Sequence, residues 1–138
     1  MRYRASVWMV AALGIAALAG CGSGTHVGVS SGLEGSYTGT YLMVELADSQ
    51  TGDVELSISY DGRIAGTFVD SATSAKGTFF GTVNTMRRCR LLIVYPTRTV
   101  SGEGDLALSD TQRLVGVLAQ KTEHGTPAGS FNLDCALH

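Results

Sequence analysis

The sequence has few of the residues from which catalytic and metal sites are usually built. Its 3 histidines, His26, His124 and His138, lie far apart, so no two have the i, i+2 or i, i+4 spacing that places paired metal ligands on one strand or helix. Its single match to Gly-x-Ser-x-Gly, at residues 28–32, falls in a glycine- and serine-rich stretch without the strand and helix that flank a catalytic serine, and no glycine-rich loop ends in Lys-Ser or Lys-Thr to bind a phosphate. We therefore predict that the protein is not an enzyme and uses no cofactor or metal.

Basic charge is also scarce. The chain has 10 lysines and arginines against 12 acidic residues, and its net charge is −2. A mildly acidic chain has no general attraction for nucleic acids, so we expect no nucleic-acid partner. Four carboxylates fall in segments with strand character, and we interpret them as solvated side chains that point outward: Asp53, Glu55, Glu103 and Asp105.

Long apolar runs are absent except at the amino end, where one short run occurs. Arg2 and Arg4 precede an uncharged stretch over residues 5–19, which is shorter than the ~20 residues that a membrane-spanning helix needs. A basic start, a short apolar region and small residues at its end are typical of a secretory signal peptide. We expect the rest of the chain to form a domain in the aqueous envelope.

The end of this run resembles a known processing site. Leu18-Ala19-Gly20-Cys21 is similar to the lipobox of bacterial lipoproteins. The resemblance implies a signal peptide over residues 1–20, cleavage before Cys21, and membrane attachment through diacylglyceryl and N-acyl groups on that cysteine. It also implies a location in the bacterial cell envelope. Because Gly22 replaces the aspartate that favours inner-membrane retention, it implies the outer membrane, on its periplasmic or surface face, if the host has two membranes. The alternatives are an ordinary signal peptide or an uncleaved anchor.

Cleavage before Cys21 would remove 20 of the 138 residues and leave 118. All 12 acidic and 8 of the 10 basic residues remain, so the net charge becomes −4. Residues 22–32 are rich in glycine and serine, and a flexible coil of this length spans roughly 18 Å. We predict a lipid-anchored cysteine and tether over residues 21–34 and a folded domain over residues 35–138.

Only two cysteines remain if Cys21 carries lipid. Cys89 and Cys135 then form an even pair in an oxidising compartment, and we predict a structural disulfide between them. It would close a loop of about 46 residues and stabilise the fold by about 4 kcal/mol through chain entropy. The alternatives are two buried free thiols, or a metal pair without nearby histidines.

The folded part has the period of β-strands. In the stretch DVELSISY, which starts at residue 53, every second residue is apolar, and Asp-Gly follows as a turn signal. A three-residue loop would pair Ile58 with Ile64 and Val54 with Phe68, which keeps the apolar residues on one face. We therefore predict a type I turn followed by a bulge at Gly62.

Repeated strings suggest a meander. GDVELS at residue 52 recurs as GDLALS at residue 104, and RIAGTF at residue 63 recurs as RLVGVL at residue 113, through either an internal duplication or chance. Residues 89–95 are apolar at both parities, which predicts a strand covered on both faces and ended by Pro96. About eight short strands without a helix favour a closed eight-stranded up-and-down barrel, and a two-sheet sandwich is the alternative.

Two features could bind a ligand or partner. Arg87, Arg88 and Arg90 could bind a phosphate or carboxylate at a barrel rim, but the favoured interpretation is a charged turn that keeps a strand end solvated. Five aromatic residues could line the barrel, which is either filled by side chains or wide enough for one small ligand: Tyr37, Tyr41, Phe68, Phe79 and Phe131.

Three functions fit this pattern. The first is a lipid-anchored, non-enzymatic binding or interaction module of the envelope, whose rim loops and arginines would contact an unidentified partner. The second is an inhibitor of a hydrolase such as a lysozyme or a protease. The third is a carrier of a small apolar ligand inside the barrel.

Overall fold

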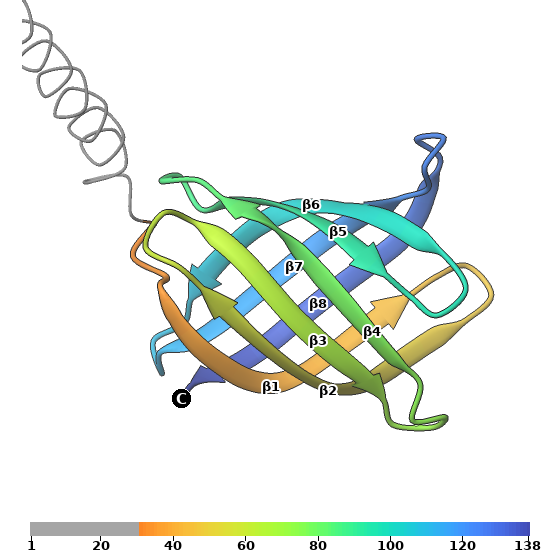
Figure 1. Ribbon diagram of the computed structural model, residues 1–138, viewed down its shortest axis with the longest axis horizontal. Helices are drawn as coiled ribbons and strands as arrows, with labels where there is room; N and C mark the ends of the chain where they lie inside the picture. Colours follow the sequence, from red (N-terminus) through yellow and green to blue (C-terminus); the bar gives the residue numbers. More distant parts are fainter. Residues whose placement is uncertain (1–30) are drawn as a thin grey trace, which may run out of the picture.

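The computed structural model describes residues 31–138. They form a closed barrel in which each strand is antiparallel to the next and the last strand pairs with the first (Figure 1). The strands are β1 (Gly35–Val44), β2 (Ser49–Ile58), β3 (Arg63–Asp70), β4 (Lys76–Val83), β5 (Arg88–Val94), β6 (Thr99–Leu108), β7 (Arg113–Lys121) and β8 (Pro127–Leu137). The predicted eight-stranded up-and-down barrel is therefore confirmed.

Several sequence-based expectations lie outside the described residues. These are the signal peptide, the lipobox with Cys21, and the tether up to residue 30. Within residues 31–138, no helix has the length and apolar character needed to cross a membrane.

The first hairpin has the predicted register. Ile58 pairs with Ile64 and Val54 pairs with Phe68, and all four side chains are buried. The Gly62 amide donates a hydrogen bond to the carbonyl of Ser59 at 3.0 Å, and the φ angle of Gly62 is 85°. A type I turn followed by a glycine in the left-handed region is the predicted bulge, so this prediction is confirmed.

One strand differs from its prediction. The segment before Pro96 forms β5, but it is covered on its inner face alone, because its burial alternates along the whole strand. Leu92 points outward and is 39% exposed, beside Phe80 of β4, which is 52% exposed. Only the inner face of a barrel wall is covered, so the apolar residues that point outward from β5 lie on the surface.

One pair of repeated strings occupies equivalent places and the other does not. RIAGTF and RLVGVL each begin the second strand of a hairpin, where Ile64 pairs with Ile58 and Leu114 pairs with Leu108. GDVELS and GDLALS are out of register, because Gly52 lies six residues before Ile58 whereas Gly104 lies four residues before Leu108. The register therefore does not decide between a duplication and chance.

The predicted disulfide between Cys89 and Cys135 is absent, and both residues are free, buried thiols. Cys89 lies on β5 and Cys135 on β8, with β6 and β7 between them. The two cysteines are therefore separated by three strand spacings of roughly 4.8 Å each. This is far more than the Cα separation of about 4.4–6.8 Å that a disulfide requires. The pairings also place Cys89 level with Phe131, four residues from Cys135. The strand order therefore keeps the two thiols apart.

The last residues of the predicted tether belong to the folded body. Leu33 is fully buried in the core, and its carbonyl accepts a hydrogen bond from the Tyr37 hydroxyl at 2.7 Å. The Nε atom of Arg87 donates to the carbonyl of Ser31 at 3.1 Å. Residues 31–34 thus close the barrel end at which the β4–β5 turn lies (Figure 1).

Candidate functional site

The barrel interior is filled by the aromatic residues that the sequence singles out as a lining. Tyr41, Phe68, Phe79 and Phe131 are each at most 2% exposed. Their ring centroids lie 4.9 Å apart for Tyr41 and Phe68, 5.3 Å for Tyr41 and Phe131, and 5.9 Å for Phe79 and Phe131. Tyr37 is also buried and belongs to the same core. Rings at these separations pack on one another. They form a core at this level of the barrel and do not surround a ligand.

Polar side chains close the other end of the barrel. The Tyr41 hydroxyl donates to Oε1 of Gln50 at 3.2 Å, and Nε2 of Gln50 donates to Oδ2 of Asp70 at 3.0 Å. The Tyr95 hydroxyl donates to Oε1 of Gln120 at 2.6 Å. These groups bond to one another, so this layer separates the apolar core from solvent.

This network shifts the acidity of its members. Hydrogen bonds from the Ala72 amide, the Thr73 hydroxyl and Gln50 lower the pKa of Asp70. Burial, followed by the charge of Asp70, raises the pKa of Tyr41 to about 12. Both groups therefore hold their ordinary charge at neutral pH, and neither is tuned as a general acid or base.

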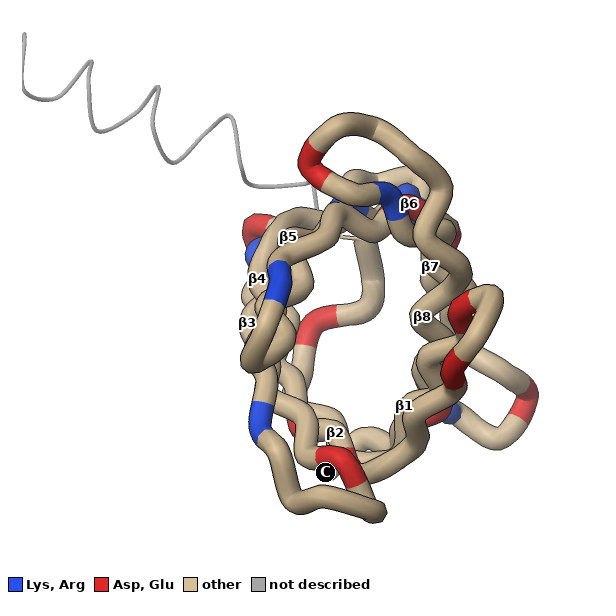
Figure 2. The backbone as a smooth tube through the Cα atoms, turned by 90° about the vertical axis from the view of Figure 1, so that its right-hand side faces the viewer, with Lys and Arg blue, Asp and Glu red and all other residues tan. Residues whose placement is uncertain are grey.

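The three arginines do not form a common anion site. Arg87 holds the carbonyl of Ser31 from a turn position with a φ angle of 64°. Arg88 and Arg90 point outward from β5, where the Nε atom of Arg90 lies 2.7 Å from the Glu103 carboxylate and a guanidinium nitrogen of Arg88 lies 3.5 Å from Asp105. Figure 2 marks these acidic and basic positions along the backbone. The charged-turn interpretation therefore fits the geometry better than a phosphate site.

The outer walls of the barrel differ in how their charges are satisfied. On the wall of β5–β8, the carboxylates of Glu103, Asp105 and Asp134 each lie within 4 Å of an arginine. On the wall of β1–β4, Asp53 and Glu55 of β2 are exposed and form no ion pair with any described residue. An unpaired carboxylate in solvent keeps its full capacity to accept hydrogen bonds.

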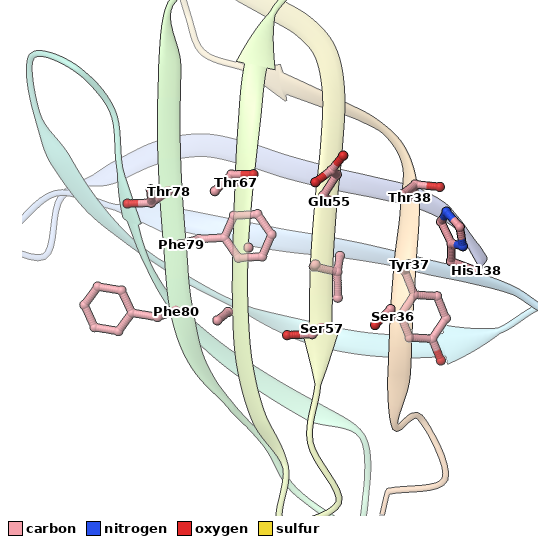
Figure 3. Close-up of a pocket in the computed structure, with 13 residues that line it drawn as sticks. Ser36, Tyr37, Thr38, Glu55, Ser57, Thr67, Thr78, Phe79, Phe80 and His138 are labelled. Carbon is pink, nitrogen blue, oxygen red and sulfur yellow. The ribbon is translucent and has the colours of Figure 1, made fainter.

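An open groove of about 680 Å³ crosses this second wall (Figure 3). Its residues form two rows, because outward side chains at one level of neighbouring strands lie side by side. The upper row follows the pairs Thr38–Glu55, Glu55–Thr67 and Thr67–Thr78. The lower row consists of Ser36, Ser57, Ala65 and Phe80.

The polar groups of the groove are not used by the fold. No hydroxyl of the two rows forms a side-chain hydrogen bond with a described residue: Ser36, Thr38, Ser57, Thr67 and Thr78. Other hydroxyls of the barrel form such bonds; the Thr51 hydroxyl, for example, donates to the carbonyl of Tyr41 at 2.9 Å. The imidazole of His138 lies beside Thr38 at one end of the groove, and the Phe80 ring lies at the other (Figure 3). Ala65, which pairs with Phe80 in the lower row, is an exposed residue with a small side chain.

The sequence predicts the outward position of one residue of this groove but not which residues lie beside it. Glu55 was predicted to be an outward, solvated carboxylate, which is where it lies. Phe80 and the hydroxyls were not singled out. The serines, threonines and Phe80 at the outward parity of four segments are the sequence signal, but their side-by-side arrangement depends on the register.

Within residues 31–138, no group of three or more His, Cys, Asp or Glu side chains is placed to hold a metal ion. Comparisons with protein families, with curated proteins and with solved structures find no match to this chain. Functional inference therefore rests on the site itself.

Proposed function

We propose that the protein is a lipid-anchored binding module of the bacterial cell envelope, with Cys21 as the anchor and the groove of β1–β4 as the binding surface. The observation that carries the choice of surface is the groove itself. It combines free hydroxyls, an unpaired carboxylate and an exposed aromatic ring on one wall, whereas the interior is packed and the opposite wall is ion-paired.

The position of the amino-terminal segment supports this arrangement. Residues 31–34 lie against one end of the barrel, and the predicted lipid anchor is ten residues before Ser31. A barrel tethered at this end presents its side wall, and therefore the groove, to the surrounding envelope.

Carriage of a small apolar ligand inside the barrel is less favoured. Such a carrier needs empty apolar space, whereas Tyr41, Phe68 and Phe131 fill the interior by contact with one another. Removal of these rings would be needed before a ligand could enter.

The anchor is tested by mass spectrometry of the protein extracted from membranes of cells that express the full chain. We expect a polypeptide that begins at Cys21 and carries two or three acyl chains. A Cys21→Ala variant serves as the control, and it should keep its signal peptide or lose membrane association. A chain without acyl groups on wild-type Cys21 would contradict the anchor.

The binding surface is tested by photo-crosslinking in the same cells. A photoreactive amino acid replaces Thr67 in the groove, or Ala119 on the outer wall of β7, where the side chain is also exposed. We expect cross-linked products from position 67 and few from position 119. Equal capture at both positions, or capture at position 119 alone, would show that the groove is not the binding surface.

A further inference from the structure

The chemistry of the groove identifies a class of ligand. This inference rests on the proposed function, since it names what the groove binds. Three properties of the two rows carry it, namely the kind of polar group, the placement of the aromatic ring, and the length of the rows.

The polar groups suit a ligand that is rich in hydroxyls. Serine and threonine hydroxyls both donate and accept hydrogen bonds, and a carboxylate accepts from donors alone. Glu55 lies in the middle of the upper row, with Thr38 on one side and Thr67 on the other. Hydrogen bonds to an ionised acceptor are about twice as strong as those between neutral groups. A ligand that offers neighbouring hydroxyls to Glu55 would therefore be held at the centre of the groove.

The aromatic ring suits a ligand with an apolar face. Phe80 is 52% exposed, although burial of a phenylalanine is normally favourable. It pairs with Ala65 in the lower row, and its ring extends outward from β4 at one end of the groove (Figure 3). Sugar rings combine both demands, because their edges carry hydroxyls and their faces carry C–H groups that pack on aromatic rings.

The rows also have the length of a chain molecule. Each row crosses four strands, and three spacings of roughly 4.8 Å give a length of about 14 Å. The rows are two residues apart along each strand, or about 7 Å. These dimensions accommodate several linked sugars and exceed what one sugar needs.

Other ligand classes fit less well. An extended peptide cannot add to the sheet, because the barrel is closed and has no free edge. An anionic ligand would be repelled by the unpaired carboxylates Asp53 and Glu55. An apolar helix would find Phe80 and its neighbour Leu92 but would cover the hydroxyls without satisfying them.

We propose that the groove of β1–β4 binds a glycan chain, with the Phe80 ring against one sugar face and the Glu55 carboxylate accepting hydrogen bonds from sugar hydroxyls. Ser57, Thr67 and Thr78 supply further hydrogen bonds along the chain. Binding of this kind forms no covalent bond and needs no cofactor.

The test is isothermal titration calorimetry on the full chain in detergent micelles. The probes are linear tetrasaccharides of N-acetylglucosamine, glucose, mannose and galactose. We expect saturable binding of at least one tetrasaccharide, with affinity at least tenfold weaker in Phe80→Ala and at least fivefold weaker in Glu55→Gln. Matched controls are Val117→Ala and Glu123→Gln, which remove an exposed apolar and an exposed acidic side chain elsewhere and should bind like the wild type.

Two results would overturn the proposal. One is the absence of binding by all four tetrasaccharides at 10 mM, a concentration on the order of that needed to detect the weakest specific sites. The other is binding that Phe80→Ala and Val117→Ala weaken equally. A protein captured from position 67 together with no sugar binding would keep the binding module and reject the glycan. Acyl groups missing from Cys21 would reject the anchor without affecting the sugar result.

Discussion

Replacement of Phe131 by alanine should destabilise the barrel strongly. The side chain is fully buried, and its ring lies 5.3, 5.6 and 5.9 Å from the rings of Tyr41, Phe68 and Phe79. Removal of a buried phenylalanine costs about 3–5 kcal/mol through lost burial and the cavity that remains. A domain of this size has a free energy of unfolding of about 5–15 kcal/mol, so a loss of about 4 kcal/mol is a large part of it.

Phe80→Ala is the matched comparison, since it deletes the same atoms from a half-exposed site. It should cost about 1 kcal/mol or less, because about half of the side chain already contacts water and little burial is lost. The assay is urea unfolding followed by far-ultraviolet circular dichroism, with the midpoint and slope fitted for both variants. Comparable losses for Phe131→Ala and Phe80→Ala would refute the filled interior. So would a loss below about 1 kcal/mol for Phe131→Ala, because it would mean that the ring borders an empty space.

Three further predictions concern the same core. In Gly77→Ala, the added Cβ would lie 2.2 Å from Cζ of Phe68, so we expect a loss of about 1–3 kcal/mol, measured by the same unfolding assay; wild-type stability would contradict this packing. Protein prepared without reductant should leave Cys89 and Cys135 unmodified by iodoacetamide when folded and alkylated when unfolded, as read by peptide mass spectrometry; a disulfide-linked peptide pair would contradict the free thiols. Burial raises the pKa of Cys89 to about 12, of Cys135 to about 11 and of Tyr41 to about 12, above the ordinary values of 9.0 for cysteine and 10.0 for tyrosine. The unfolded chain therefore loses these protons first, and the free energy of unfolding should fall from about pH 9 to pH 12 in urea titrations; a constant value over this range would show that the groups are solvated.

The parts of the fold that depend on alternation and turn chemistry follow from the sequence. The pairing of Ile58 with Ile64 is the one register that keeps apolar residues together, and Gly62 takes the left-handed position that the turn demands. Inward placement of Phe131 and Cys135 follows from the same parity. Closure follows from the even number of similar strands, because an open sheet would leave two unpaired edges.

The disulfide prediction failed because it treated two cysteines as a pair without placing their strands. In an up-and-down order, Cys89 and Cys135 belong to strands that are three positions apart. The predicted fold already contained this separation. Parity shows that both thiols point inward but gives no information on the distance across the barrel.

The proposed binding surface could not be predicted because it depends on which residues of neighbouring strands lie beside one another. Glu55 and Glu103 are alike in sequence, each at an outward position of a strand. Glu103 is paired because the neighbouring strand places Arg90 beside it, whereas the neighbours of Glu55 are Thr38 and Thr67. The difference between a satisfied and an available carboxylate is therefore set by register and not by local sequence.

The most direct measurement of the binding surface is nuclear magnetic resonance mapping of the full chain in detergent micelles. Backbone amide spectra are recorded as a mixture of the four tetrasaccharides is added. We predict that shifts concentrate in residues 36–38, 55–57, 65–67 and 78–80, the four segments that form the groove. Shifts at the polar layer of Gln50, Asp70 and Tyr95, or on the wall of β6–β8, would contradict the groove as the binding surface, as would a spectrum that does not change.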